Sequence, residues 1–209
     1  MPSRLFFLSP ANVSGIRAKQ LMSPRAGFAA AVMYRSPDGV PIADAFAFMS
    51  ALYFRGKIAY ARRFAQPSPV VAGDGIFVIT PGYGLVGPDW RITAERMKKL
   101  RATDIDVATS SYTKPLREHA RRIAEALTAE PDAEIVLLGS IASGKYVDVL
   151  MPILGGNLRF PAAFAGLGDM ARGGLMLRAA RADRELAYTT LDAPRHRAPG
   201  TSGKMPVLP

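Results

Sequence analysis

The sequence contains no cysteine, which excludes disulfide bonds, thiolate-bound metal sites and a cysteine nucleophile. Histidine is almost as scarce, because His119 and His196 are the only two in 209 residues. One chain therefore cannot supply a three-histidine metal site, and we expect neither a metal site nor a cofactor. The pattern places His119 on the exposed face of a helix and His196 in a C-terminal tail, so we do not expect a catalytic histidine either.

Long apolar runs are also missing. No stretch of about 18 apolar residues is present, so the sequence predicts no membrane-spanning helix and no membrane partner. The first apolar run, RLFFLS, is too short for a signal peptide and is predicted to be the first strand of the fold. These absences are typical of a cytoplasmic protein. The sequence carries no signature of an oligomeric state.

Negative charge is under-represented. Lysine and arginine number 27 against 17 aspartates and glutamates, which gives a formal net charge of +10. A basic balance of this size favours nucleic acid or a phosphate-bearing small molecule as partner, because neutralised phosphates release counterions. The alternative is that the arginines are spread over a solvated surface.

Apolar residues make up 49% of the chain, which is enough to bury a core. Short apolar runs alternate with segments of helical periodicity, and this pattern predicts a single three-layer α/β domain over residues 1–192 with a mainly parallel sheet. Alternating apolar residues at 175–179 and 186–190 predict a C-terminal β-hairpin, and the Pro- and Gly-rich residues 193–209 a flexible tail. The predicted strands cover 4–9, 76–80 and 134–139, and the predicted helices 16–22, 42–65 with a break at Gly56, 93–102, 112–130 and 145–154.

Three of the predicted strands end in unusual loops. These are SPANVSG, which contains Asn12, TPGYGLVGPD, which contains Tyr83, and GSIASGK. Ligands of parallel sheets bind at the carboxyl ends of the strands. We therefore expect the three loops to meet at one edge of the sheet and to build one site. In that site Asn12 is a candidate nucleotide contact, and the ring of Tyr83 a candidate for stacking on a base.

The loop GSIASGK has the G-x-x-x-x-G-K spacing of a phosphate-binding loop, formed by Gly139, Gly144 and Lys145. Tyr146 stands where that motif requires a Ser or Thr hydroxyl for Mg²⁺, so a standard nucleotide triphosphatase is not expected. Backbone amides, the Lys145 ammonium and the hydroxyls of Ser140 and Ser143 still favour a phosphate or carboxylate. The alternative is a structural turn between strand and helix.

Two further segments carry candidate residues. The glycine-rich segment GLGDMARGGL is predicted to be a loop that presents Asp169, our candidate catalytic carboxylate, beside the anion-binding candidate Arg172. Simple pairing of these two side chains is the alternative, and Asp74, Asp89 and Asp148 are other candidate carboxylates. In ALYFRGKIAYARRF, Arg55 and Lys57 alternate with aromatic residues, which is typical of nucleic-acid contacts, although aromatics at this spacing also suit a core.

Residues 50–92 resemble an uncharacterised family of small bacterial α/β domains and carry a strand-YGL element similar to that of the peroxide-stress YaaA-like proteins. The resemblance lies in Leu52-Tyr53, Tyr60-Ala61, Thr80, Tyr83-Gly84-Leu85 and Pro88-Asp89. It implies an α/β domain linked to nucleic-acid protection or base modification. The segment Thr80-Pro81-Gly82 departs from the family pattern, which more often has Ser and then a small or basic pair, and no catalytic role is transferred.

Three functions compete on these grounds. The first is a protein that processes a nucleotide, nucleoside or nucleic-acid base, with glycosidic-bond chemistry as one form of it. The second is a non-catalytic basic protein that binds DNA or RNA and is associated with stress or repair. The third is a scaffold in which all three loops are structural. A shared pocket lined by the three loops would favour the first.

Overall fold

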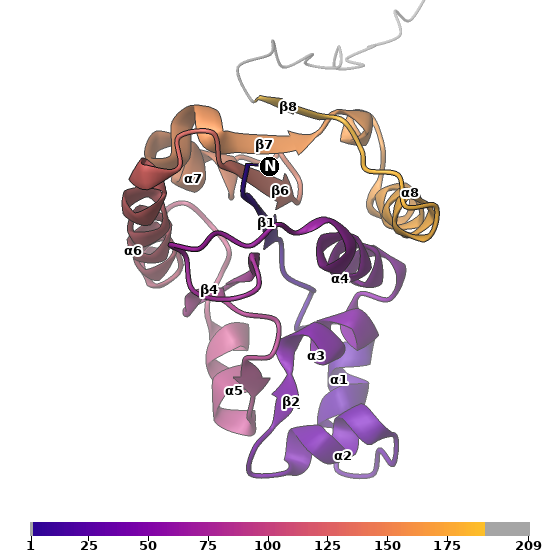
Figure 1. Ribbon diagram of the computed structural model, residues 1–209. Coiled ribbons are helices and arrows are strands. Elements are labelled where there is room, and N and C mark those ends of the chain that lie inside the picture. The colour runs from indigo at the N-terminus through magenta and orange to yellow at the C-terminus, as the bar shows by residue number, and fades with distance from the viewer. Residues whose placement is uncertain (1, 191–209) are drawn as a thin grey trace, which may run out of the picture.

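The described part of the chain, residues 2–190 of a computed structural model, is built around a six-stranded sheet (Figure 1). The strands run in the order β4-β3-β1-β6-β7-β8, and β1, β3, β6 and β7 are parallel. An antiparallel strand closes each edge, since β4 pairs with β3 and β8 with β7. The strands are β1 (Arg4–Leu8), β3 (Ile76–Thr80), β4 (Gly84–Val86), β6 (Glu134–Leu138), β7 (Leu158–Pro161) and β8 (Tyr188–Thr190). The predicted mainly parallel α/β fold is confirmed.

Both faces of the sheet are covered, which explains why its central strands are apolar throughout. Along β1, Phe6 and Leu8 enter one core cluster, whereas Leu5 and Phe7 enter a second cluster on the opposite face. Figure 1 shows α4 and α8 on one face and α6 and α7 on the other, which makes three layers. These helices are α4 (Leu52–Phe64), α6 (Ser110–Ala126), α7 (Val147–Leu154) and α8 (Asp169–Arg181).

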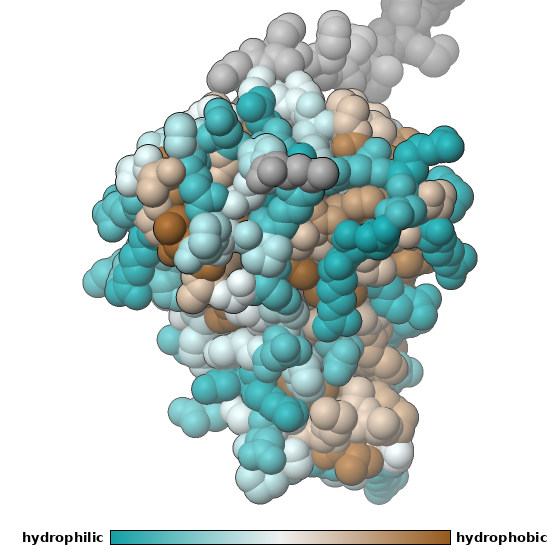
Figure 2. Space-filling model, in the orientation of Figure 1, coloured by the Kyte–Doolittle hydropathy of each residue, from teal (hydrophilic) through white to brown (hydrophobic). Residues whose placement is uncertain are grey.

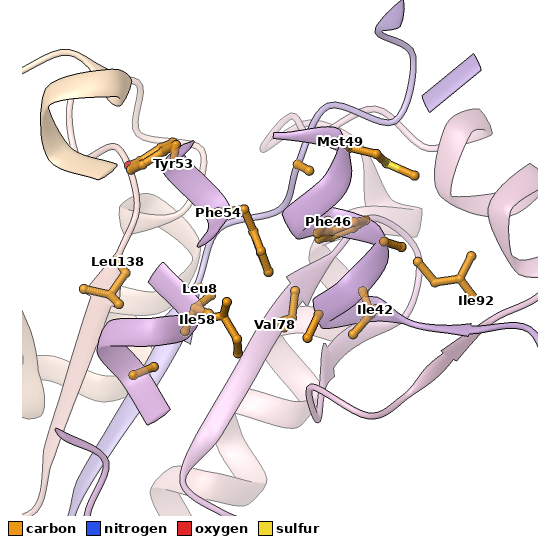
Figure 3. Packing of buried hydrophobic residues seen from close by; sticks show 14 of the residues in the cluster. Leu8, Ile42, Phe46, Met49, Tyr53, Phe54, Ile58, Val78, Ile92 and Leu138 are labelled. Carbon is orange, nitrogen blue, oxygen red and sulfur yellow. The ribbon is translucent and has the colours of Figure 1, made fainter. Parts of the chain in front are cut away.

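The remaining helices form a lobe below the sheet in Figure 1. It contains a two-stranded antiparallel pair, in which Val40 lies opposite Ile92. Figure 3 shows how this lobe joins the main core, since Ile42 and Phe46 pack beside Phe54 and Val78. The elements of the lobe are α1 (Ile16–Met22), α2 (Ala29–Arg35), β2 (Val40–Pro41), α3 (Ile42–Met49), β5 (Arg91–Ile92) and α5 (Ala94–Ala102). Residues 2–190 also contain three short 3-10 turns, at Leu127–Ala129, Gly155–Asn157 and Ala162–Phe164.

Two local predictions were wrong. The sheet does end in an antiparallel pair, β7 and β8, but residues 175–179, predicted as one strand of the hairpin, are helical in α8. The segment predicted as a glycine-rich loop at 166–175 also contributes Asp169 and Arg172 to the first turn of this helix. Gly173 and Gly174 made a helix improbable from propensity alone, and packing against α4 overrides that preference.

The predicted break at Gly56 was also misplaced. The helical segment 42–65 is interrupted at Ser50 and Ala51, and Gly56 lies inside α4. The predicted tail, residues 193–209, and His196 lie outside the described residues. Within the described part, no helix has both the length and the apolar composition that a membrane crossing requires.

Candidate functional site

A pocket of about 540 Å³ lies at the carboxyl ends of the parallel strands. Its wall contains residues from the loop after β1, Pro81 after β3, and Ser140 and Lys145 after β6. The three strand-end loops therefore meet, as the sequence predicted. The full lining is Ser9, Pro10, Ala11, Asn12, Val13, Ser14, Ser50, Tyr53, Pro81, Leu100, Arg101, Thr103, Asp104, Ile105, Ser140, Lys145, Tyr146 and Asp169.

The parallel pairing of β1 and β6 brings the first and third loops together. The amide of Ser9 donates to the carbonyl of Leu138 at 3.1 Å, which extends the strand pairing by one residue beyond β1. Gly139 lies directly beside Ser9, and a Cβ at this glycine would be only 3.0 Å from the Ser9 Cβ. The missing side chain of Gly139 thus leaves room for the Ser9 hydroxyl at the floor of the pocket.

The lobe supplies a wall that sequence reasoning missed. Leu100 and Arg101, near the C-terminal end of α5, and Thr103 and Asp104 just beyond it line the side facing the loops. The hydroxyl of Thr103 donates to the carbonyl of Lys99, which fixes this end of the helix. Helix and sheet meet here only through tertiary packing, so no local pattern signalled these four residues.

The loop GSIASGK contributes only part of its length. Ser140 and Lys145 line the pocket, whereas Ser143 is exposed and outside the lining. Gly144 has a φ of +71°, and a Cβ added there would lie only 2.4 Å from Oδ2 of Asp148, so this carboxylate packs against the glycine. A negative charge at this position opposes an anion at Gly144. Phosphate binding by Ser140 and Lys145 stays a prediction.

Asn12 and Tyr83 have different positions. Asn12 lines the pocket, and its Oδ1 accepts from the amide of Ser14 at 2.9 Å, an Asx turn that shapes the loop. Tyr83 is absent from the lining. Its ring packs against Trp90, with the centroids 5.0 Å apart, and the Lys99 ammonium lies 4.3 Å from its centroid. A role of Tyr83 in stacking on a base therefore stays a prediction without support from the pocket.

Asp169 and Arg172 begin α8 and face the pocket unequally. The Asp169 carboxylate lines it and is 68% exposed, whereas the Arg172 side chain is 12% exposed. Their nearest charged atoms are 3.9 Å apart, which makes a weak ion pair. Arg172 is held elsewhere, because its guanidinium donates twice to the carbonyl of Phe164. The Asp169 carboxylate is thus left accessible to a ligand.

The structure separates Arg55 from Lys57. Arg55 is exposed on the outer face of α4, whereas Lys57 is 1% exposed and points toward the end of β1. Its Nζ donates to the Ser9 carbonyl at 3.0 Å and to the Ser9 Oγ at 2.6 Å. Lys57 therefore does not share a nucleic-acid-binding surface with Arg55. The signal that could have found this is its spacing, since Lys57 lies four residues after the buried Tyr53 and three before the buried Tyr60.

Burial sets the proton affinities around this lysine. It lowers the pKa of Lys57 from 10.5 to about 7, with Asp169 raising it and Arg172 lowering it further. Burial likewise raises the pKa of Tyr53 and of Tyr146, and a hydrogen bond to the Ser9 side chain counters the shift at Tyr146. Burial therefore disfavours the charged form of Lys57.

His119 is not part of the pocket. It lies on α6, half-buried, with its Nδ1 within hydrogen-bonding distance of the Leu85 backbone. Across residues 2–190, no three His, Asp or Glu side chains lie close enough together to hold a metal ion. Comparison of the chain with protein-family models, curated proteins and solved structures finds no match.

Proposed function

We propose that this protein binds a nucleotide or nucleoside in the pocket at the carboxyl ends of β1, β3 and β6 and acts on its glycosidic bond. The observation that carries the proposal is the convergence in one pocket of hydroxyl and ammonium groups from the strand-end loops and a carboxylate from the start of α8. A volume of about 540 Å³ is suitable for a ligand of nucleotide size, since small-molecule sites span roughly 300–1,000 Å³.

Each part of such a ligand has a candidate partner. Lys145 and Ser140 offer a positive charge and a hydroxyl to a phosphate. Tyr53 and Tyr146 offer aromatic surface to a base or a sugar. Asp169 offers a carboxylate, which can stabilise positive charge developing on the sugar or activate a water molecule as glycosidic bonds break. Substitution of Lys145 should therefore weaken binding of the phosphate, whereas substitution of Asp169 should slow cleavage of the glycosidic bond.

The anion assignment is tested by calorimetry with nucleoside 5′-monophosphates and the corresponding free nucleosides. We expect Lys145→Ala to weaken monophosphate binding about tenfold or more and to leave nucleoside binding nearly unchanged. Lys98→Ala removes an exposed lysine of α5 outside the pocket and is the matched control. Equal affinity of wild type and Lys145→Ala for the monophosphates would refute the assignment.

The chemical step is tested separately by chromatography of free base released from the bound nucleotides. We expect Asp169→Asn to slow release at least a hundredfold while the affinity measured by calorimetry stays within a few-fold. Release that is equally fast in the Asp169→Asn variant would remove the carboxylate from the mechanism. Binding without release of base from any nucleotide would reduce the proposal to a binding function.

A second candidate function is the non-catalytic binding of DNA or RNA, and a groove on the outer face of α4 and α8 favours it. Arg55, Arg62 and Arg181 are exposed along this groove of about 390 Å³. We expect binding of duplex DNA or single-stranded RNA to weaken steeply with salt and to fall in the double variant Arg55→Ala/Arg62→Ala. Arg25→Ala, at an exposed site beyond α1, is the control. Salt-insensitive binding would contradict this second function.

A further inference from the structure

A buried contact between Lys57 and Ser9 lies at the wall of the pocket. Lys57 Nζ lies 2.6 Å from Ser9 Oγ and 3.0 Å from the Ser9 carbonyl oxygen. The ring of Tyr53 covers a further side of this amine, with its centroid 3.8 Å from Nζ. The ion pairs of residues 2–190 include none to Lys57. A lysine buried without a carboxylate partner is costly as a cation, so its neutral form is favoured.

The two residues differ in their access to the pocket. Ser9 is part of the pocket wall, whereas Lys57 lies behind it and is absent from the lining. A ligand in the pocket therefore contacts the Ser9 hydroxyl, and the Lys57 amine lies on the far side of that hydroxyl from the ligand. Tyr146 also lines the pocket, and its pKa responds to the Ser9 side chain, which indicates that the two side chains are neighbours. A pocket hydroxyl in direct contact with a buried amine is the arrangement of a nucleophile and its general base.

We infer that Ser9 is a nucleophile of this pocket, that Lys57 is its general base, and that the pair transfers acyl groups from an ester or amide substrate. Serine-lysine pairs perform this chemistry where no histidine is available. The only histidine among the described residues, His119, contacts Leu85 instead. The inference shares its pocket with the proposed function but does not require the ligand to be a nucleotide.

The covalent step balances without a further reactant. Neutral Lys57 takes the proton of Ser9 as the Ser9 Oγ forms a bond to the carbonyl carbon, and the carbonyl π pair moves onto the carbonyl oxygen. When that pair returns, the bond from the carbonyl carbon to the leaving group breaks, and the leaving group receives the proton from the Lys57 ammonium. Water then attacks the acyl-Ser9 ester, gives a proton to Lys57, and the Ser9 Oγ recovers its proton as it departs.

The electrostatic surroundings suit this role. Burial brings the pKa of Lys57 to about 7, close to the ideal value for a general base at neutral pH. Two charged groups of α8 act electrostatically on Lys57: Asp169 raises its pKa and Arg172 lowers it. The rings nearest its Nζ are those of Tyr53 and Phe54 in its own helix, with centroids 3.8 and 5.7 Å away. Asp169 and Arg172 carry opposite charges, so burial is the dominant cause of the shift.

The experiment is covalent labelling of the full chain with phenylmethanesulfonyl fluoride and with p-nitrophenyl acetate, followed by peptide mass spectrometry. We expect modification at Ser9, none in Ser9→Ala, and wild-type labelling in Ser111→Ala, a control at an exposed serine of α6. Lys57→Met should slow labelling at least a hundredfold. Modification of a different pocket serine, no modification of Ser9, or unchanged labelling in Lys57→Met would overturn the inference.

A measurement on the unsubstituted protein keeps the test decisive if Lys57→Met does not fold. The labelling rate of wild-type Ser9 should rise with pH and level off above a midpoint near 7. A rate that keeps rising through pH 9 would show an unassisted hydroxyl and would overturn the role of Lys57. Nucleotide affinity is measured on the same preparation by calorimetry without the label, so this inference and the proposed function can fail independently.

Discussion

Gly56 of α4 and Gly173 of α8 face each other at a distance that leaves no room for a side chain. A Cβ added to Gly56 would lie 2.5 Å from the carbonyl oxygen of Gly173, and a Cβ added to Gly173 would lie 2.7 Å from the carbonyl oxygen of Leu52. Because the obstacles are backbone atoms, the helices would have to separate. Their contact brings Asp169, at the start of α8, to the same pocket wall as Tyr53, where its charge acts on the pKa of Lys57.

The first prediction concerns this crossing. We expect Gly56→Ala to lower the free energy of unfolding by about 1–3 kcal/mol, because overpacking outweighs the better helix propensity of alanine. Gly174→Ala is the matched control, since a Cβ there meets only the flexible end of Arg178. Urea unfolding monitored by circular dichroism measures both. Equal stability of the two variants would mean that the helices separate at no cost.

The second prediction is a pH dependence of stability that originates in Lys57. The unfolded chain holds the Lys57 proton up to about 10.5 and the folded chain only up to about 7, so the unfolded state binds more protons between these values. Stability should therefore rise with pH, by at most about 1.4 kcal/mol per pH unit. The raised pKa values of the buried tyrosines change the free energy of unfolding only above about pH 10, where tyrosines of the unfolded chain lose their protons.

Urea unfolding of wild type and Lys57→Met at pH 6, 7, 8 and 9 measures this effect. We expect the variant to lack the rise between pH 7 and 9 and to be at least as stable as wild type at pH 6, because an apolar side chain replaces a buried charge. A parallel pH dependence in the two proteins would contradict the assignment of the shift to Lys57.

The parts of the fold that the sequence predicted are those governed by local pattern. The runs around Phe6, Val78 and Val136 are apolar and short, bounded by Pro or Gly, and they form β1, β3 and β6, three of the four parallel strands. The meeting of their loops follows from parallel pairing. Gly173 and Lys57 misled local reasoning, since glycine disfavours a helix and lysine a core. The partners that accommodate them lie more than 40 positions away in the chain.

The third prediction concerns Ala51, which precedes α4 with a φ of +46° and a ψ of −116°. Residues other than glycine are strained in this region, and Ser50 beside it lines the pocket. We expect Ala51→Gly to stabilise the protein by about 1 kcal/mol, the strain relieved minus the added chain entropy. Ala59→Gly, inside α4, should instead cost about 1 kcal/mol. Thermal unfolding distinguishes them, and a loss of stability in Ala51→Gly would show that the strain is absent.

The last prediction joins packing to chemistry at Gly139. An added Cβ would lie 3.0 Å from the Ser9 Cβ and 3.3 Å from its Oγ, so alanine must shift the Ser9 side chain by a few tenths of an ångström and disturb its alignment with Lys57. We expect Gly139→Ala to slow labelling of Ser9 at least tenfold at pH 7 while the fold is retained. Gly87→Ala, where a Cβ meets nothing within 4 Å, should label as wild type does. Because nucleophile and base must stay within hydrogen-bonding distance, a Gly139→Ala protein that labels normally would mean that the 2.6 Å contact has no part in the reaction.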